Sequence, residues 1–252
     1  MAKPAALQNH YLSLKPIPPA ERLIFALDVP SVAKARELVE VLGDAVRFYK
    51  LGLELFMAGG YFELIQWLRE RSKKVFVDLK FFDVPETVRS AVRQLTQHDA
   101  TFTTVHGNDS MLRAAADAAK ESDNSLKVLA VTVLTSLDQG DLRDLGFDCD
   151  LKTLVLSRAR RALALGCHGV ISSGLEAPEL REELGEQFLI ITPGIRPVEN
   201  VDDQKRTVDV EQAFLNGADY IVVGRPIRNA ADPWAAAERI QQRIAALFSA
   251  PS

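Results

Sequence analysis

The 252-residue sequence lacks several features that would assign a protein class directly. It has two cysteines, Cys149 and Cys167, and they do not form a C-x-x-C pair, so we expect two reduced thiols rather than a disulfide framework or a zinc site. No apolar run approaches the ~18 residues of a membrane span, and the N-terminus lacks the continuous apolar segment that is typical of a secretory signal. The net charge of −4 also lacks the basic excess typical of nucleic-acid-binding proteins. We therefore expect a cytoplasmic protein that binds neither nucleic acid nor membrane.

Proline is concentrated at the N-terminus, where four of the 12 prolines lie within the segment MAKPAALQNHYLSLKPIPPAER. This composition predicts an extended leader over residues 1–21 that precedes one domain over residues 22–252. A single domain of this length suits an α/β barrel, and the hydrophobic share of 47% is sufficient for a large core.

The main part of the chain repeats one pattern: a short apolar run, a small or charged loop, and an amphipathic helical stretch. Continuous apolar runs indicate strands that are buried on both faces. The eight runs cover residues 23–29, 47–53, 74–80, 101–107, 127–136, 168–174, 188–195 and 220–227. Eight strand–helix units favour a single closed (β/α)₈ TIM barrel in the α/β class. An open doubly wound sheet is the alternative, but neither G-x-G-x-x-G after the first strand nor a P-loop motif occurs.

The stretch KVFVDLKFFDVPETV, residues 74–88, places charges within an apolar strand. Alternation along an ideal strand would put Asp78 and Lys80 on one face and Asp83 on the other. A buried ion pair stabilises a protein poorly, because desolvation can exceed the Coulomb attraction, and barrel interiors are usually filled by Val, Ile and Leu. We therefore predict a chemical role for Asp78 and Lys80 rather than a structural one.

Polar residues also end other strands, where the active site of a barrel lies. Asp28 ends the first strand, Lys50 lies in the second, and Thr135 and Ser136 end the fifth. His106 ends the fourth strand, and we expect it to support the site structurally rather than to act in catalysis. None of the histidines has the spacing of a metal-ligand cluster, so we expect no metal site.

The last two strands end in the segments TPGIR and VGRP. Many barrels bind phosphate at this place, through backbone N–H groups of the loops. Gly194 and Gly224 would allow close approach of the backbone, and Arg225 could bind phosphate oxygens with two N–H groups. The polar loop over residues 196–210 is either a lid on this site or a variable surface loop.

These residues resemble a known family. The stretch DLKFFDVPETV is similar to the D-x-K-x-x-D signature of the orotidine 5′-phosphate decarboxylases. The stretches FALD, YKLG, VTVLTS, TPGIR, DDQKR and VGRPI occur in the same order as that family's other motifs, and the resemblance covers roughly residues 22–248.

The resemblance implies decarboxylation of orotidine 5′-phosphate to uridine 5′-phosphate and CO₂ without a cofactor, in a homodimer with its sites at the interface. The implied catalytic residues are Lys50, Asp78, Lys80 and Asp83, with Lys80 as the proton donor and with Asp83 and Thr87 reaching the neighbour's site. Asp28 would hold a ribose hydroxyl, and Thr135 would meet the pyrimidine. The remaining implied residues bind the phosphate or bridge to it: Gly194, Arg196, Gln204, Gly224 and Arg225.

Three alternatives remain open on the residues alone. A related group of Mg²⁺-dependent sugar-phosphate enzymes shares D-x-K-x-x-D, but it carries a carboxylate where this chain has Lys50. A Schiff-base aldolase would need Lys80 as a neutral amine, which flanking carboxylates disfavour. A non-catalytic sensor of phosphorylated ligands would not need two buried lysines and two aspartates.

Overall fold

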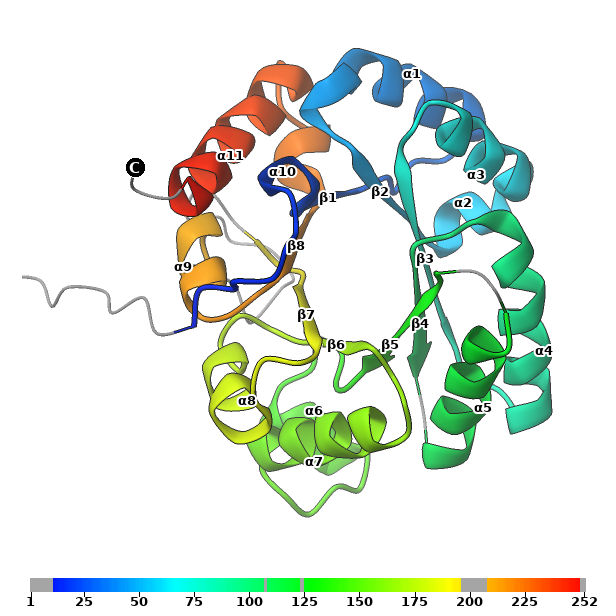
Figure 1. Cartoon of the computed structure of the whole chain (residues 1–252), viewed down its shortest axis with the longest axis vertical. Coiled ribbons are helices and arrows are strands. Elements are labelled where there is room, and N and C mark those ends of the chain that lie inside the picture. Colours follow the sequence, from blue (N-terminus) through cyan, green and yellow to red (C-terminus); the bar gives the residue numbers. More distant parts are fainter. Residues whose placement is uncertain (1–10, 107, 123–124, 196–207, 250–252) are drawn as a thin grey trace, which may run out of the picture.

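The protein is a closed barrel of eight parallel strands in sequential order, with helices outside it (Figure 1). The computed structural model describes residues 11–106, 108–122, 125–195 and 208–249. The predicted (β/α)₈ barrel is confirmed, and each strand lies within or across one of the eight apolar runs. The strands are β1 (Leu23–Ala26), β2 (Phe48–Leu51), β3 (Lys74–Phe81), β4 (Phe102–His106), β5 (Lys127–Val131), β6 (Gly169–Ile171), β7 (Leu189–Thr192) and β8 (Tyr220–Val223).

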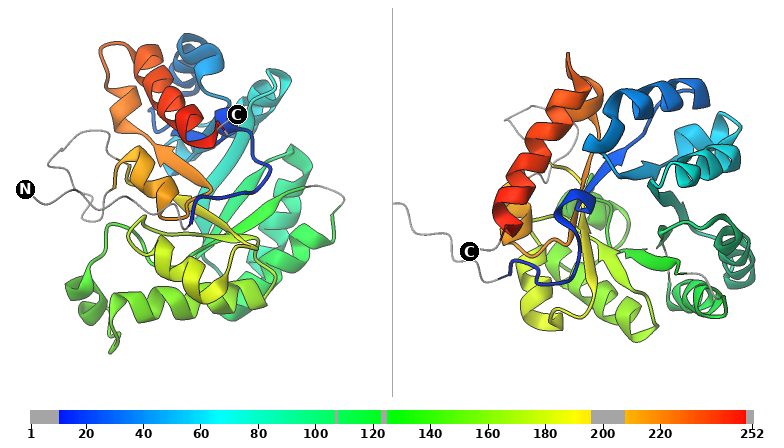
Figure 2. Two further views of the ribbon diagram at one scale, coloured as in Figure 1. Left: turned by 60° about the vertical axis from the view of Figure 1, so that its left-hand side comes forward. Right: turned by 45° about the horizontal axis from the view of Figure 1, so that its top comes forward.

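The helices lie outside the strands and cover their outer face (Figure 2), while the inner face lies in the barrel interior, so both faces of each strand are buried. They are α1 (Val32–Leu42), α2 (Leu53–Met57), α3 (Tyr61–Glu70), α4 (Pro85–Leu95), α5 (Asp109–Lys120), α6 (Gln139–Asp144), α7 (Leu151–Ala164), α8 (Ala177–Leu184), α9 (Val210–Leu215), α10 (Arg225–Arg228) and α11 (Pro233–Phe248). The Asp232 side chain caps α11 by accepting a hydrogen bond from the Ala235 N–H. None of the helices in the described part of the chain combines the length and apolar character that a membrane crossing requires.

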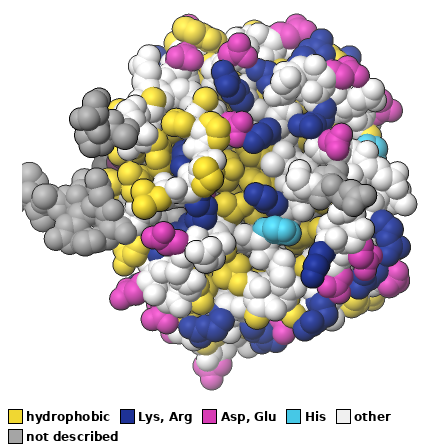
Figure 3. Space-filling model, viewed as in Figure 1, with side chains coloured by type: hydrophobic (Ala, Val, Ile, Leu, Met, Phe, Trp, Pro, Cys, Tyr) yellow, Lys and Arg dark blue, Asp and Glu magenta, His cyan; other side chains and the backbone are white. Residues whose placement is uncertain are grey.

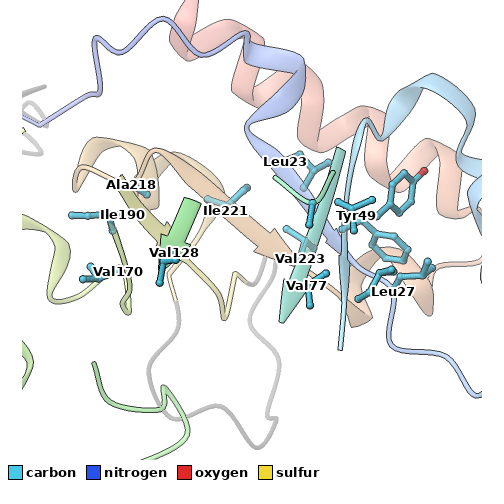
Figure 4. Packing of buried hydrophobic residues seen from close by; sticks show 14 of the residues in the cluster. Leu23, Leu27, Tyr49, Val77, Val128, Val170, Ile190, Ala218, Ile221 and Val223 are labelled. Atoms are coloured by element: carbon cyan, nitrogen blue, oxygen red, sulfur yellow. The ribbon is translucent and has the colours of Figure 1, made fainter. Parts of the chain in front are cut away.

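Alternate residues of each strand enter two separate apolar layers. Residues such as Leu23, Tyr49 and Val77 belong to the larger layer between the strands and the helices (Figure 4). The inward residues form a smaller cluster that fills the barrel, and it includes Phe48 and Phe76. Phe102 and Tyr220 join them, with ring centroids 5.2 Å apart. Aromatic rings therefore fill much of this interior, where the sequence analysis expected mainly Val, Ile and Leu.

The described part of the proline-rich leader packs against the barrel near the start of β8. Asp219, which is fully buried, accepts hydrogen bonds from Ser13 Oγ at 2.5 Å and from Lys15 Nζ at 3.0 Å. Its other carboxylate oxygen accepts from Arg181 Nη2 at 2.7 Å and from the Ile190 N–H at 2.9 Å. This carboxylate thus joins residues 13–15 to α8 and to the last two strands.

The Asp219 cluster generates a stability prediction. Asp219→Ala leaves the buried Arg181 guanidinium without its carboxylate, and breaking such a pair costs about 3–5 kcal/mol. We expect a clearly lower urea midpoint, measured at fixed protein concentration. Glu183→Ala is the matched control, because it removes an exposed partner of Arg160 at 3.4 Å and should cost about 1 kcal/mol or less. Equal midpoints for the two variants would show that the cluster does not hold the fold together.

Candidate active site

Four charged side chains of alternating sign form a row at the carboxyl ends of the first three strands. Lys50 Nζ lies 3.2 Å from Asp28 Oδ1 and 3.3 Å from Asp78 Oδ2. Lys80 Nζ donates to both carboxylate oxygens of Asp78, at 3.0 Å each. The order Asp28–Lys50–Asp78–Lys80 brings together three of the four residues in the implied catalytic set and the residue implied to hold the ribose.

Strand alternation explains why these side chains meet. Phe48 and Phe76 point into the barrel, and Lys50 and Asp78 each follow two residues later on the same face. In the β2–β3 ladder, Lys50 pairs with Phe76, and Asp78 lies two residues after Phe76 on the same face. This register brings Lys50 close to Asp78. The row therefore lies directly above the aromatic filling, at the end of the barrel where active sites occur.

The middle of the row is almost withdrawn from solvent, because the Lys50 and Asp78 side chains are only 12% and 10% exposed. Burial by itself would raise the pKa of Asp78, but Lys50 and Lys80 outweigh it and hold that pKa below its usual value. Burial would likewise lower the pKa of Lys50, but Asp78 and Asp28 outweigh it and raise that pKa. Both groups are therefore ionised at neutral pH.

Strand β3 is irregular at Lys80. The ladder with β4 pairs Val77 with Thr103 and then Phe81 with Val105. Between these two pairs, β3 advances by four positions while β4 advances by two. Lys80 itself has a φ of +49°, in the left-handed region that a lysine seldom adopts. The ideal strand assumed from the sequence does not extend to this residue.

Asp83 and Thr87 lie outside the row. The expectation that alternation turns Asp83 to the opposite face is wrong in its premise, because β3 ends at Phe81 and Asp83 lies in the loop before α4. Both side chains are exposed, and Asp83 Oδ1 accepts a hydrogen bond from the Val84 N–H at 2.6 Å. Among the described residues, Asp83 forms no ion pair with Lys50 or Lys80.

A cavity of about 440 Å³ opens beside the charged row, a size that suits a small-molecule ligand. Its wall contains Thr135 and Arg225 together with Gly194 and Gly224. On the face shown in Figure 3, hydrophobic side chains at the centre are bordered by basic side chains (Lys or Arg), acidic side chains (Asp or Glu) and a His, which matches this mixed lining. The full lining is Ala26, Asp28, Lys50, Phe76, Asp78, Lys80, Val131, Val133, Leu134, Thr135, Ile171, Pro193, Gly194, Val222, Gly224, Arg225 and Arg228.

Backbone geometry supports the two glycine positions. Gly194 has a φ of +80°, which favours glycine, and a Cβ on Gly224 would lie 3.3 Å from the Ala26 Cβ. Arg196 and Gln204, which the family resemblance also implies at this end, lie outside the described residues, as does most of the 196–210 loop.

Two further residues of the site were missed in the sequence analysis. A Cβ on Gly52 would lie 3.2 Å from Asp28 Oδ1 and 3.4 Å from Lys50 Nζ, so glycine leaves room for the ion pair. Arg228 lines the cavity and donates from Nη1 to the backbone carbonyl of Asp28. Its position three residues after Arg225, on the same helix, was the available signal.

His106 lies next to the site but does not line the cavity. Its ring packs edge to face with Phe82, with centroids 5.6 Å apart. Burial lowers its pKa, and the charges of Arg158 and Lys80 lower it further, so the imidazole is neutral at pH 7.

The donor set does not suit a divalent cation. The described residues contain no group of three or more His, Cys, Asp or Glu side chains placed to hold a metal. Asp28 and Asp78 are near each other, but the Lys50 ammonium lies between them and contacts both. A metal ion at this point would meet a fixed positive charge.

Comparison with known proteins adds to this geometry. The family model described as orotidine 5′-phosphate decarboxylase / HUMPS family matches residues 21–240. An orotidine 5′-phosphate decarboxylase from Methylococcus capsulatus is 64% identical over 96% of this chain and 99% of its own length. One from Stenotrophomonas maltophilia is 51% identical over 93% of this chain and 97% of its own length.

A solved structure agrees with these relatives. The crystal structure of orotidine 5′-phosphate decarboxylase from Lactobacillus acidophilus superposes with a TM-score of 0.79 at 37% identity, covering 89% of this chain and 99% of that one. The fold, the charged row and the sequence matches agree over nearly the whole chain, which belongs to the orotidine 5′-phosphate decarboxylase / HUMPS family.

Proposed function

We propose that this protein converts orotidine 5′-phosphate to uridine 5′-phosphate and CO₂, the last step of de novo uridine 5′-phosphate synthesis. The observation that carries the proposal is the buried Asp78 carboxylate, held between two lysine ammonium groups beside a nucleotide-sized cavity. Family membership and the similarity to named decarboxylases support the same reaction.

The cavity suggests how the substrate would lie. Arg225 and the backbone near Gly194 and Gly224 would bind the phosphate, since they lie at the ends of the last two strands. Thr135 would face the pyrimidine, and Asp28 would accept a hydrogen bond from a ribose hydroxyl. This placement leaves the reacting carbon of the ring next to Lys80. Arg196 and Gln204 would complete the phosphate end, as the family resemblance implies.

The chemistry then follows from the charges. Breaking the bond between C6 and the carboxylate releases CO₂ and leaves the electron pair on C6, where no neighbouring carbonyl accepts it. The Lys80 ammonium would stabilise this carbanion and then transfer a proton from Nζ to C6. Asp78 would lie close to the substrate carboxylate and repel it in the ground state. Although the phosphate binds far from C6, its binding energy can still be used to close the site around the reacting centre.

The alternatives fit the geometry less well. A Mg²⁺-dependent sugar-phosphate enzyme would need a cation where the Lys50 ammonium already contacts Asp28 and Asp78. A Schiff base at Lys80 would remove the ammonium that donates to both oxygens of the buried Asp78 carboxylate. A sensor that only binds phosphorylated ligands would have no use for this buried row, whose desolvation is unfavourable.

We also propose that the protein works as a homodimer, in which Asp83 and Thr87 of one protomer complete the site of the other. Large hydrophobic side chains are exposed around Asp83, and a surface of this kind favours a protein–protein interface. Phe82 and Val84 flank it with 66% and 61% exposure. Further exposed large hydrophobic side chains occur on α2 and α3, namely Leu53, Phe56, Met57 and Phe62.

A cytoplasmic setting is the final part of the proposal. Cys149 and Cys167 are both free thiols, as is usual in a reducing compartment. Burial raises the pKa of Cys167 to about 12, which makes that thiol unreactive at neutral pH.

The first prediction of the proposed function is turnover without a metal. Purified protein should convert orotidine 5′-phosphate to uridine 5′-phosphate at the same rate with and without EDTA, because the Lys50 ammonium already lies between Asp28 and Asp78, where a metal ion would bind. The absorbance change of the pyrimidine measures the rate. Activity that disappears with EDTA and returns with Mg²⁺ would favour the metal-dependent alternative.

The second prediction concerns the phosphate end. Arg225→Ala should weaken binding of uridine 5′-phosphate by about 1.5–3 kcal/mol, or roughly 10- to 150-fold, since a charged hydrogen bond is lost. Calorimetric titration measures the affinity. Uridine, which lacks the phosphate, is the control ligand and should bind wild type and variant alike. An unchanged affinity for uridine 5′-phosphate would remove Arg225 from the phosphate site.

The third prediction tests the shared site by mixing two inactive variants, Lys80→Ala and Asp83→Ala. In a heterodimer, one composite site carries both substitutions and the other carries neither. The mixture should therefore regain up to about half of the wild-type activity per heterodimer if subunits exchange.

The control mixture combines Lys80→Ala with Asp78→Ala. These two residues come from the same strand, so each site keeps one substitution and activity should stay lost. Inactive Lys80→Ala/Asp83→Ala heterodimers, purified and of confirmed composition, would contradict the shared site. Recovery in the control mixture would contradict the placement of Asp78 and Lys80 in one site.

A further inference from the structure

Lys80, the proton donor of the proposed reaction, has an unusual backbone conformation. Lys80 has a φ of +49° within a strand, where lysine normally has an extended backbone. The same place carries the β3–β4 irregularity between Val77 and Phe81, which removes the regular ladder partners. Something other than the ladder must therefore hold Lys80 in this conformation.

One hydroxyl group satisfies the requirement. The Lys80 N–H donates to Thr104 Oγ1 at 3.0 Å, and the Thr104 hydroxyl donates to Asp78 Oδ1 at 2.9 Å. Thr104 lies on β4 two residues after Phe102, so it points into the barrel toward β3. It is fully buried and lies outside the cavity lining.

We infer that Thr104 is a positioning residue for the reaction, an inference that rests on the proposed function. Its hydroxyl links the backbone of the proton donor to the carboxylate that the same donor contacts through its side chain. The three-residue arrangement fixes both ends of Lys80: the N–H on Thr104, and Nζ on the two oxygens of Asp78. Thr104 thereby sets where the Lys80 ammonium lies relative to C6 of the substrate.

Loss of the hydroxyl should act on the chemical step more than on binding. Valine has nearly the shape of threonine but leaves the Lys80 N–H without its acceptor and Asp78 with one donor fewer. The bulge can then relax and displace Nζ, and misplacement of a reacting group by about 1 Å can lower a rate about 100-fold. The phosphate end of the cavity, around Arg225, is built from other strands and should keep its affinity.

The chain offers a matched control at the preceding position. Thr103 is also fully buried on β4, but it points to the opposite face of the strand. Its Oγ1 has no hydrogen-bond partner among the residues that the structure describes. Thr103→Val therefore makes the same chemical change, one residue away, without removing a hydrogen bond.

The experiment measures kcat and KM for orotidine 5′-phosphate and the Kd for uridine 5′-phosphate in four variants and in wild type. Thr104→Val should lower kcat roughly 10- to 100-fold, with KM and Kd within about threefold of wild type. Thr104→Ser, which keeps the hydroxyl, should stay within about threefold in kcat. Thr103→Val should stay within about twofold. Thr104→Ala is compared with Thr104→Ser, so that the hydroxyl is tested even if the valine variant fails to fold.

Each outcome has a distinct meaning. A kcat for Thr104→Val, or for Thr104→Ala if valine does not fold, within twofold of wild type would overturn the positioning role. An equal loss in Thr104→Ser and Thr104→Ala would also overturn it, because the hydroxyl would then not matter. Parallel losses of kcat and of uridine 5′-phosphate affinity would mean that Thr104 only maintains the structure of the whole site. Failure of wild type to turn over the substrate would instead contradict the proposed function itself.

Discussion

The structure of the site depends on keeping one carboxylate charged inside the barrel. Asp78 is almost withdrawn from water, and an isolated carboxylate in that environment would protonate or destabilise the fold. Lys50 and Lys80 prevent this by contacting its two oxygens from two directions. The compensation works only if β2 and β3 keep the register that pairs Lys50 with Phe76. A change in the register of β2 and β3 would therefore also separate Lys50 from Asp78 and upset the charge balance of the site.

The sequence predicts most of this arrangement because its determinants are local. Continuous apolar runs separated by helical patterns are sufficient to identify eight strands, and two-residue alternation is sufficient to put Lys50 and Asp78 on the inner faces. The glycines and the arginine at the ends of the last two strands, Gly194, Gly224 and Arg225, line the cavity, and their role in binding phosphate stays a prediction. In each case the chain itself, over a few residues, fixes the direction of the side chain.

The features that sequence reasoning missed depend on contacts between distant residues. The left-handed conformation of Lys80 is supported by Thr104, 24 positions away on the next strand, and lysine itself gives no sign of it. The end of β3 at Phe81 removes the basis for assigning Asp83 a strand face. The attachment of residues 13–15 depends on Asp219, 206 positions after Ser13. No local pattern could show these contacts, because each requires the closed barrel to bring its partners together.

Buried charge alone does not distinguish the site from the scaffold. Asp78 and Asp219 are both buried carboxylates, and each contacts two cationic side chains. Asp219 also accepts hydrogen bonds from Ser13 Oγ and from the Ile190 N–H. It is fully buried, so its hydrogen bonds are complete within the protein. Asp78 instead lines an open cavity together with both of its lysines. A substrate can exchange contacts with the second arrangement and cannot reach the first. The burial of charge therefore does not identify the active site. The active site is identified by a charged row that a ligand can reach and whose members can form new contacts with that ligand.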